Sequence, residues 1–451
     1  MGLERKPLLT CWFCPHTQKL HIQNDFGTCS RSIGVYHNYI LRETSYFHSK
    51  PETGTLVLLM SRDEKKLLRI RNAMRHEGLT ALVLRIPENV SYLSDAWPGR
   101  GLTYLIVPLD RDPILVHPSG ETIPETWVED MRLYKWETYE HLGDSLTAGV
   151  DEVQRALTDL GIRSGAIGIE EGWEHFLGTP LRYEMIVVGE KTTTALKNRL
   201  AGYEMKNASP LLVLARSVKT KGEVVALRKA NRIARVGLET FERNLKSGLT
   251  EVQLSSKIEH EIVTQGVMKF RSNHVVACAF VASGPSTAEA YKYVVGNTKR
   301  KMRRGDLVML ELDVVADGYS SDTTRTFVVG KPDKRQRALL EAVLDSERSA
   351  IADIRPGVNA AEIARRSIEV IQKHGMSDCL VHRLGHGIGV AVHEQIPALH
   401  VESKDVLKPG MVHSVEPGVY SQRFGGIRIE DDILDTESGT EYLSNFPRIQ
   451  E

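Results

Sequence analysis

The chain has 451 residues, with 58 Lys and Arg against 58 Asp and Glu, so its formal net charge is zero. This balance excludes a global basic field for nucleic acid or an anionic membrane, although it leaves room for a local patch. No apolar run approaches the roughly 18 residues that span a bilayer, so no membrane partner is expected. Cysteines are too few for a disulfide framework, which favours a reducing, cytoplasmic compartment.

Residues 1–59 differ from the rest of the chain because they show no clear periodicity. A zinc knuckle would have to be built from Cys11, Cys14, His16, His21 and Cys29. Their spacing fits no standard zinc-finger pattern. We interpret this segment as a poorly ordered or atypical extension and hypothesise that it is dispensable. A sharper version of this hypothesis is that translation begins at Met60.

Residues 60–218 alternate between helical and strand patterns, which predicts an α/β domain. The first helix is expected to open with Ser61 as its N-cap and Glu64 three residues later, in a capping box. Further helices are expected over DEVQRALTDLG and around ALKNRLAGYE. The predicted strands are 79–86, 103–109 and 166–171.

Residues 219–451 form the second predicted domain, with the boundary near 218–222. A long amphipathic helix leads into a second helix over 251–266. Strands are then expected at 274–282, 307–315, 324–329, 411–416 and 426–434, and helices at 334–353 and 359–374. Helices followed by antiparallel-looking strands predict an α+β domain.

Two β-rich runs in residues 305–330 flank Asp317-Gly318, which is a strong hairpin signal. Glu311 and Asp322 lie almost symmetrically about this turn, so we expect them to be near neighbours across the two strands. Neighbouring carboxylates repel each other unless a cation or a shared proton lies between them. Acidic pairs on an exposed hairpin face are also common, so this signal alone does not establish a metal site.

Two further carboxylates lie in apolar strand patterns between residues 412 and 435. Glu416 is flanked by valine and proline, and Glu430 follows isoleucines in alternation. A carboxylate embedded in an apolar strand is unfavourable unless it is paired or metal-bound. The alternative to a metal is that Arg428 pairs with one of these acids.

The segment HRLGHGIGVAVHEQIPALH contributes histidines. His386 sits between glycines, and His393 follows seven residues later. This is not a zincin helix, because Pro397 occupies the position where that motif needs its second histidine. An isolated histidine is usually structural, but four carboxylates with one histidine make an oxygen-rich donor set that suits two divalent ions.

Four segments carry a family resemblance: GDLVMLELDVVADGYSSDTTRTF, GHGIGVAVHE, VEPGVY and GGIRIEDD. In this order and spacing they resemble the creatinase, prolidase and aminopeptidase P branch of the pita-bread superfamily. The match spans 220–435, and the preceding segment resembles the N-terminal domain of that branch. The resemblance implies an α+β fold, with a pita-bread (creatinase/methionine aminopeptidase-like) domain over 219–451 behind a smaller creatinase-type α/β domain over 60–218.

The resemblance also implies site residues. The metal ligands would be Glu311, Asp322, His386, Glu416 and Glu430, holding two divalent ions of manganese, cobalt, iron or zinc. Glu416 would also act as general base, and His393 would contact the scissile carbonyl or stabilise the tetrahedral intermediate. Arg428 would support the metal-bound carboxylates and bind a substrate carboxylate.

The implied activity is that of an Xaa-Pro dipeptidase or aminopeptidase-like metallohydrolase, which cleaves a small peptide or amide bond with a metal-activated water. Tyr291 falls near the position where the peptidases carry a substrate-contacting histidine, and it would share oxyanion stabilisation with His393. Family members commonly form homodimers, in which Trp97 and Arg100 could reach over the partner's active site.

The chain departs from the family pattern in three places. The first hairpin ligand is normally Asp, and here it is Glu311, for which Asp313 on the same strand face could compensate. Ser286 and Tyr291 replace an asparagine and a histidine, and HEQIP is one residue longer than the family's HExP. These departures leave two alternatives open: a member of the same fold (creatinase, ectoine-hydrolase or lyase-like) acting on a small nitrogenous or sulfonium metabolite, or a non-catalytic binding protein.

Overall fold

The computed structural model describes residues 62–98, 102–120, 126–135, 139, 142–171, 189–292 and 296–449, together with the backbone of three strands near the N-terminus. The chain divides into two compact units, Met1–Leu58 and Leu59–Glu451. In the first unit, β1 (Thr10–Cys14), β2 (Lys19–Asn24) and β3 (Gly27–Ser32) form an antiparallel meander. The side chains of the considered zinc knuckle, and Met60, lie outside the described residues.

The second unit begins with a six-stranded mixed sheet in the order β7-β6-β5-β4-β8-β9. Its strands are β4 (Leu79–Leu84), β5 (Tyr104–Pro108), β6 (Ile114–Pro118), β7 (Asp130–Tyr134), β8 (Ala166–Ile169) and β9 (Glu204–Asn207). Its helices are α3 (Glu64–Glu77), α4 (Pro87–Ser94), α5 (Ser145–Asp159), α6 (Glu190–Arg199) and α7 (Ser209–Ser217). The predicted α/β pattern is confirmed here.

Strand β4 shows why this sheet needs helices on both faces. Leu82 and Leu84 belong to the apolar cluster that includes α3 and α7, whereas Ala81 and Val83 belong to the cluster that includes α5. Alternate residues of a strand point to opposite faces, so an unbroken apolar run is stable only when both faces are covered.

The start of α3 differs from the prediction. The helix begins at Glu64, and Asp63 is its N-cap, accepting hydrogen bonds from the backbone amides of Lys65 and Lys66. The expected capping box between Ser61 and Glu64 is therefore wrong. The physical reason is that Asp63 is itself a strong N-cap residue and stands directly before the helix.

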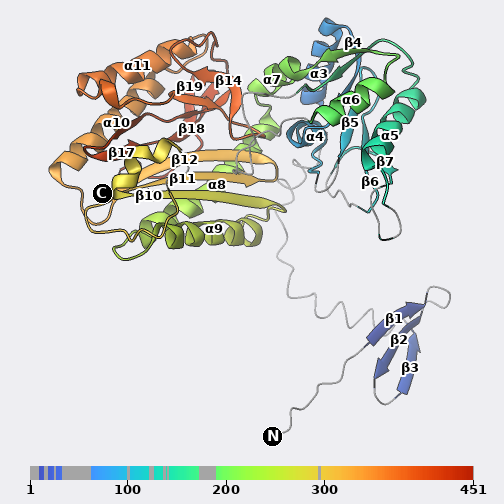
Figure 1. Cartoon of the computed structure of the whole chain (residues 1–451), viewed down its shortest axis with the longest axis horizontal. Coiled ribbons are helices and arrows are strands. Elements are labelled where there is room, and N and C mark those ends of the chain that lie inside the picture. The colour runs from blue at the N-terminus through green and yellow to red at the C-terminus, as the bar shows by residue number, and fades with distance from the viewer. Residues whose placement is uncertain are drawn as a thin grey trace. The chain divides into compact units, whose positions relative to one another are not determined.

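The C-terminal part of the unit places its strands between two helix pairs (Figure 1). Helices α8 (Lys221–Asn244) and α9 (Glu251–Met268) pack on a sheet of β10 (Val275–Ser283), β11 (Leu307–Ala316) and β12 (Tyr319–Val328). Helices α10 (Lys334–Asp353) and α11 (Ala360–Lys373) pack on the other strands. Among the described residues, no helix is both long and apolar enough to cross a membrane.

The remaining strands form a five-stranded sheet, in the order β14-β13-β15-β18-β19, and a separate hairpin of β16 and β17. Their bounds are β13 (Gly385–Gly387), β14 (Glu394–Leu399), β15 (Val412–Val415), β16 (Gly418–Ser421), β17 (Gly425–Arg428), β18 (Asp431–Thr436) and β19 (Gly439–Tyr442). The described residues also include two 3-10 helices, η2 (Gly284–Lys292) and η3 (Ser377–Cys379). The single strand expected over 426–434 is thus divided between β17 and β18.

The β11–β12 hairpin confirms the turn expected at Asp317-Gly318. Both residues have positive φ, 50° and 84°, as a two-residue type I′ turn requires. The register places Asp313 opposite Asp322 and Thr324 opposite Glu311. Glu311 and Asp322 are therefore diagonal neighbours rather than directly opposite.

The segment between β17 and β18 crosses onto β12 and so brings Glu430 to the hairpin. The amide of Glu430 donates to the carbonyl of Thr324 at 3.1 Å. Arg325 reaches back and donates to the carbonyl of Glu430 at 2.6 Å and to Asp431 Oδ1 at 2.7 Å. These bonds fix the position of Glu430 relative to β12.

Candidate metal centre

The β11–β12 hairpin supplies three carboxylates to one buried site. Glu311, Asp313 and Asp322 offer oxygen atoms that all lie within 4.8 Å of one another. All three side chains are buried. The alternation of side chains places Glu311 and Asp313 on one face of β11, and the register aligns that face with Asp322.

His386 meets this hairpin from β13. Its neighbours must be glycines, because a Cβ on Gly385 or Gly387 would collide with the backbone oxygen of Ser414 or Ile396. Nδ1 of His386 lies 3.1 Å from the carbonyl oxygen of Gly387. A carbonyl only accepts, so Nδ1 carries the proton and Nε2 presents a lone pair.

The lone pair on His386 Nε2 faces two carboxylates. Asp322 Oδ2 lies 3.4 Å away, and Glu416 Oε1 lies 3.5 Å away. Three acceptors pointing at one another are unfavourable unless a cation or a proton lies between them. A histidine that donates through Nδ1 to a backbone carbonyl and leaves Nε2 open is also the usual arrangement of a metal-ligating imidazole.

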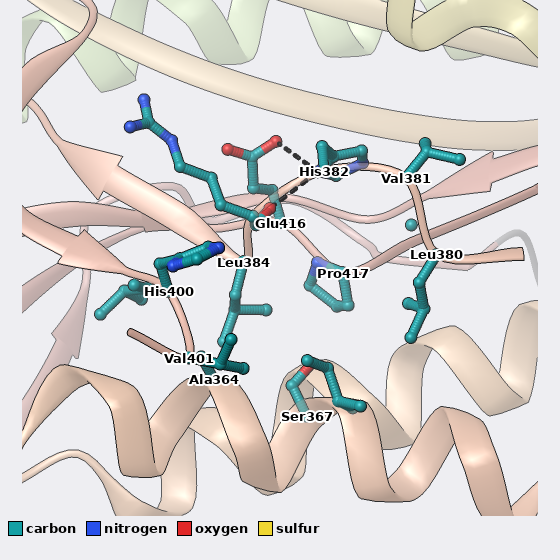
Figure 2. A pocket seen from close by; sticks show the side chains of 14 residues that line it. Ala364, Ser367, Leu380, Val381, His382, Leu384, His400, Val401, Glu416 and Pro417 are labelled. Atoms are coloured by element: carbon teal, nitrogen blue, oxygen red, sulfur yellow. Dashed lines mark hydrogen bonds and ion pairs between the residues drawn. The ribbon is translucent and has the colours of Figure 1, made fainter. Parts of the chain in front are cut away.

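Glu416 follows β15 and lies at the edge of a cavity. Ser414 Oγ donates to its Oε1 at 3.4 Å, and His382 Nδ1 lies 3.7 Å from its Oε2. Figure 2 shows Glu416 and His382 on one side of this cavity and helix α11 on the other. The cavity has a volume of about 310 Å³ and is lined mainly by apolar side chains of α11, β14 and the loop before β13.

Glu430 shares the hydroxyl of Thr324 with Glu311. Thr324 Oγ1 lies 2.6 Å from Glu430 Oε2 and is also in hydrogen-bond contact with Glu311 Oε2. Arg428 donates from Nε to the same hydroxyl at 2.9 Å and forms an ion pair with Glu311. Its Nη1 donates to Tyr420 Oη at 3.0 Å.

The electrostatics of the protein alone disfavour charged ligands here. Burial raises the pKa of Asp322 well above its ordinary value, and the neighbouring Glu430 and Asp313 raise it further. Burial, followed by Glu430, raises the pKa of Glu416 in the same way. Burial lowers the pKa of His386 well below its ordinary value. A divalent cation would reverse this balance for the carboxylates, because it favours their ionised form, and it would favour the neutral imidazole of His386 further.

The residues present fit a divalent metal. Asp322 Oδ1 and Glu430 Oε1 are buried, and neither has a hydrogen-bond partner among the described residues. Two further groups of ligand atoms within 4.8 Å comprise Asp322, His386 and His393, and His386, Glu416 and Glu430. A cluster of carboxylate oxygens with one neutral imidazole suits manganese, iron, cobalt or zinc.

The structure brings together all five residues that the sequence predicted as ligands. His393 lies beside them, with its ring centroid 4.1 Å from that of His386. Tyr291 packs edge-on against Tyr420 at 5.2 Å, and thus lies next to a partner of Arg428.

Sequence reasoning missed several residues that contact the site. Thr324 was visible only as part of the TTRT segment, and nothing in the sequence marks Ser414 or His382 as neighbours of Glu416. Trp97 stacks on His274 of its own chain at 5.9 Å. Arg100, which was expected to accompany Trp97, lies outside the described residues.

Comparisons with known proteins identify the family of this chain. The family model "Metallopeptidase family M24" matches residues 225–437, and the model "Creatinase/Prolidase N-terminal domain" matches residues 66–218. An Xaa-Pro dipeptidase of Pyrococcus furiosus is 34% identical over 85% of this chain and 99% of its own length.

Solved structures show the same likeness. The crystal structure of the prolidase from Pyrococcus horikoshii is 27% identical, with a TM-score of 0.70, over 85% of this chain and 99% of that one. The prolidase from Pyrococcus furiosus is 28% identical, with a TM-score of 0.67, over 84% of this chain and 100% of that one. This chain therefore belongs to metallopeptidase family M24, in its creatinase, prolidase and aminopeptidase P branch, and the pita-bread fold expected from its motifs is confirmed.

Proposed function

We propose that this protein is an Xaa-Pro dipeptidase that works with two divalent metal ions. The observation that carries the proposal is the convergence of Asp322, His386, Glu416 and Glu430 with the acidic face of β11. The Xaa-Pro dipeptidase of Pyrococcus furiosus, which this chain covers almost completely, supports the substrate class. The same likeness does not favour the alternative of a metabolite-specific member of the fold.

When bound, the metal ions supply a Lewis acid for the peptide carbonyl and lower the pKa of a bound water. Residues of the chain transfer the proton and donate hydrogen bonds to the substrate. Glu416 directs Oε1 toward His386 and Oε2 toward His382, so we assign it the transfer of a proton from the attacking water to the leaving amine. His393 is half-buried, whereas the candidate ligands are buried, so its imidazole is the more accessible to substrate.

We assign His393 and the half-buried Tyr291 to the carbonyl oxygen of the substrate, where each can donate a hydrogen bond. Arg428 is buried and contacts Glu311, Thr324 and Tyr420. These contacts support its predicted role of holding the acidic groups in place. Its predicted contact with a substrate carboxylate stays a prediction, as do the homodimer and the cytoplasmic compartment.

The test combines a metal measurement with a substrate panel. Protein purified without added ions is analysed for metal by mass spectrometry and assayed with Xaa-Pro dipeptides, Xaa-Pro tripeptides, creatine and ectoine. We expect hydrolysis of the dipeptides, loss of that activity with a chelator, and recovery with manganese or cobalt. Full turnover by the metal-free protein, or turnover of creatine or ectoine alone, would contradict the proposal.

A further inference from the structure

Strand β11 presents two buried carboxylates to the metal centre, and they have different surroundings. Glu311 is paired in register with Thr324, and Asp313 is paired with Asp322. Directly opposed side chains on one face of an antiparallel pair have Cβ atoms about 5 Å apart. The hairpin therefore places Asp313, and not Glu311, directly beside the carboxylate of Asp322.

Glu311 already has a cationic partner. Its Oε2 forms the ion pair with Arg428 and contacts the hydroxyl of Thr324. Arg428 is buried, with an exposed fraction of only 2%. Moving Glu311 from Arg428 to a metal ion would leave this buried guanidinium with Glu430 Oε2, 3.8 Å from its Nε, as its remaining ion-pair partner at the site, which is unfavourable.

Asp313 lies opposite Asp322, whose contact with His386 is unfavourable without a cation. Asp322 is 1% exposed, and its Oδ1 has no hydrogen-bond partner in the described part of the chain. Its other oxygen points at the lone pair of His386. An ion bound to Asp322 and His386 would lie beside the carboxylate that the register places opposite Asp322.

We propose that Asp313, rather than Glu311, is the carboxylate that β11 contributes to the metal centre, and that Glu311 is the counter-ion that positions Arg428. This inference rests on the proposed function only in taking the site to bind metal. The longer side chain of Glu311 reaches Arg428, whereas the shorter side chain of Asp313 stays beside Asp322. The two acidic positions on β11 thus have separate tasks.

The first experiment compares Asp313→Asn with Glu311→Gln, two isosteric changes two residues apart on one strand. Each full-length variant is stripped of metal, checked for native circular dichroism, and titrated with Mn²⁺ by calorimetry. We expect Asp313→Asn to weaken Mn²⁺ binding at least tenfold or to lose an ion per chain. Glu311→Gln should keep the wild-type stoichiometry and bind within threefold of wild type.

A second pair of variants tests metal ligation directly. It gives a result even if the Asp313→Asn protein does not fold. Asp313→Cys and Glu311→Cys are loaded with Co²⁺, and wild type serves as the blank for the natural cysteines. A thiolate bound to cobalt gives a charge-transfer absorption in the near ultraviolet, which we expect for Asp313→Cys alone.

Equal loss of metal in Asp313→Asn and Glu311→Gln, loss in Glu311→Gln alone, or a cobalt–thiolate band only in Glu311→Cys would overturn the inference while leaving the metallopeptidase proposal intact. A wild-type protein that binds no Mn²⁺ would instead remove the proposed function itself. The two failures are therefore distinguishable.

Discussion

His386 joins two groups of candidate ligands that come from distant parts of the chain. Its Nε2 faces Asp322 of β12 on one side and Glu416, which follows β15, on the other. Its Nδ1 is held by the carbonyl of Gly387. Removing this imidazole therefore takes away the group that lies between Asp322 and Glu416.

Replacing His386 with alanine is expected to reduce bound metal below one ion per chain and to lower kcat/KM by at least about 100-fold. Metal analysis and an Xaa-Pro dipeptide assay on the purified variant measure both effects. His76→Ala is the matched control, because that side chain is 86% exposed and lies in α3. A His386→Ala protein that keeps wild-type metal content would contradict the assigned ligand role.

The pKa shifts of the buried acids predict how the metal-free protein responds to pH. The pKa values of Asp322 and Glu416 are raised well above their ordinary values by burial, so the folded chain holds protons that the unfolded chain releases near pH 4. Stability from these two groups therefore falls as pH rises toward their folded pKa values. His386, with its lowered pKa, has the opposite effect, but only below the ordinary histidine pKa of about 6.5.

Above pH 6.5 the contribution of His386 is absent. With a chelator present, we expect the midpoint of thermal unfolding to fall as pH rises above 6.5, until the two carboxyls lose their protons in the folded chain. Saturating Mn²⁺ should remove most of this slope, because an ion keeps the carboxylates ionised throughout. An identical slope with and without Mn²⁺ would show that these acids do not bind the metal.

The residue types at the site could be predicted from the sequence, and their individual tasks could not. Glu416 and Glu430 stood out because carboxylates are unfavourable in apolar strands, and the structure buries both. The pairing of Arg428 with Glu311 was not visible, because the two residues are brought together only when the end of β17 packs on Thr326 of β12. Contacts of this kind depend on the packing of distant strands.

At the scale of elements, turn chemistry and strand length decide what the sequence reveals. The Asp317-Gly318 signal predicts the β11–β12 hairpin, and a two-residue turn also implies that Asp313 opposes Asp322. The approximate symmetry of Glu311 and Asp322 about this turn predicts near neighbours, and the register makes them diagonal neighbours. Strand β13 has only three residues, too few for an alternation pattern, although it carries His386.

The hairpin turn offers a test of the element that aligns the acids. Gly318 has a φ of 84°, and a Cβ there would come within 3.0 Å of Ser91 Oγ. Gly318→Ala is therefore expected to lower the free energy of unfolding by about 1–2 kcal/mol, measured by urea denaturation. Gly202→Ala is the control, because a Cβ at Gly202 meets nothing within 4 Å. Equal effects of the two changes would argue against a strained turn.

At the scale of the molecule, the sequence could not predict the contacts between the domain built on the six-stranded sheet and the metallopeptidase domain. Lys66 of α3 donates to the hydroxyl of Tyr319 in β12 at 2.9 Å. Arg216 of α7 and Lys219 both bind the carboxylate of Glu394, at 2.9 and 3.0 Å. The domain division at residue 218 and the dispensability of residues 1–59 remain predictions.

Glu394 connects Arg216 and Lys219 to the site, because it is the residue after His393. Burial alone would raise its pKa, but Arg216 and Lys219 outweigh burial and hold its pKa below the ordinary value. The stability that this carboxylate contributes is therefore complete above the unfolded pKa of about 4.3 and is lost as pH falls below it. At neutral pH the ion pairs are fully formed.

Replacing Glu394 with glutamine is expected to destabilise the protein by about 3–5 kcal/mol at pH 7, because two buried cations lose their counter-charge. Its backbone and His393 should shift, so KM for Xaa-Pro dipeptides should rise even where the variant is folded. Urea denaturation and steady-state kinetics measure the two effects. Glu171→Gln, which removes one partner of an exposed ion pair with Lys197, should change stability by less than about 1 kcal/mol. If Glu394→Gln behaved like this control, the buried ion pairs would not be what joins the two domains at the site.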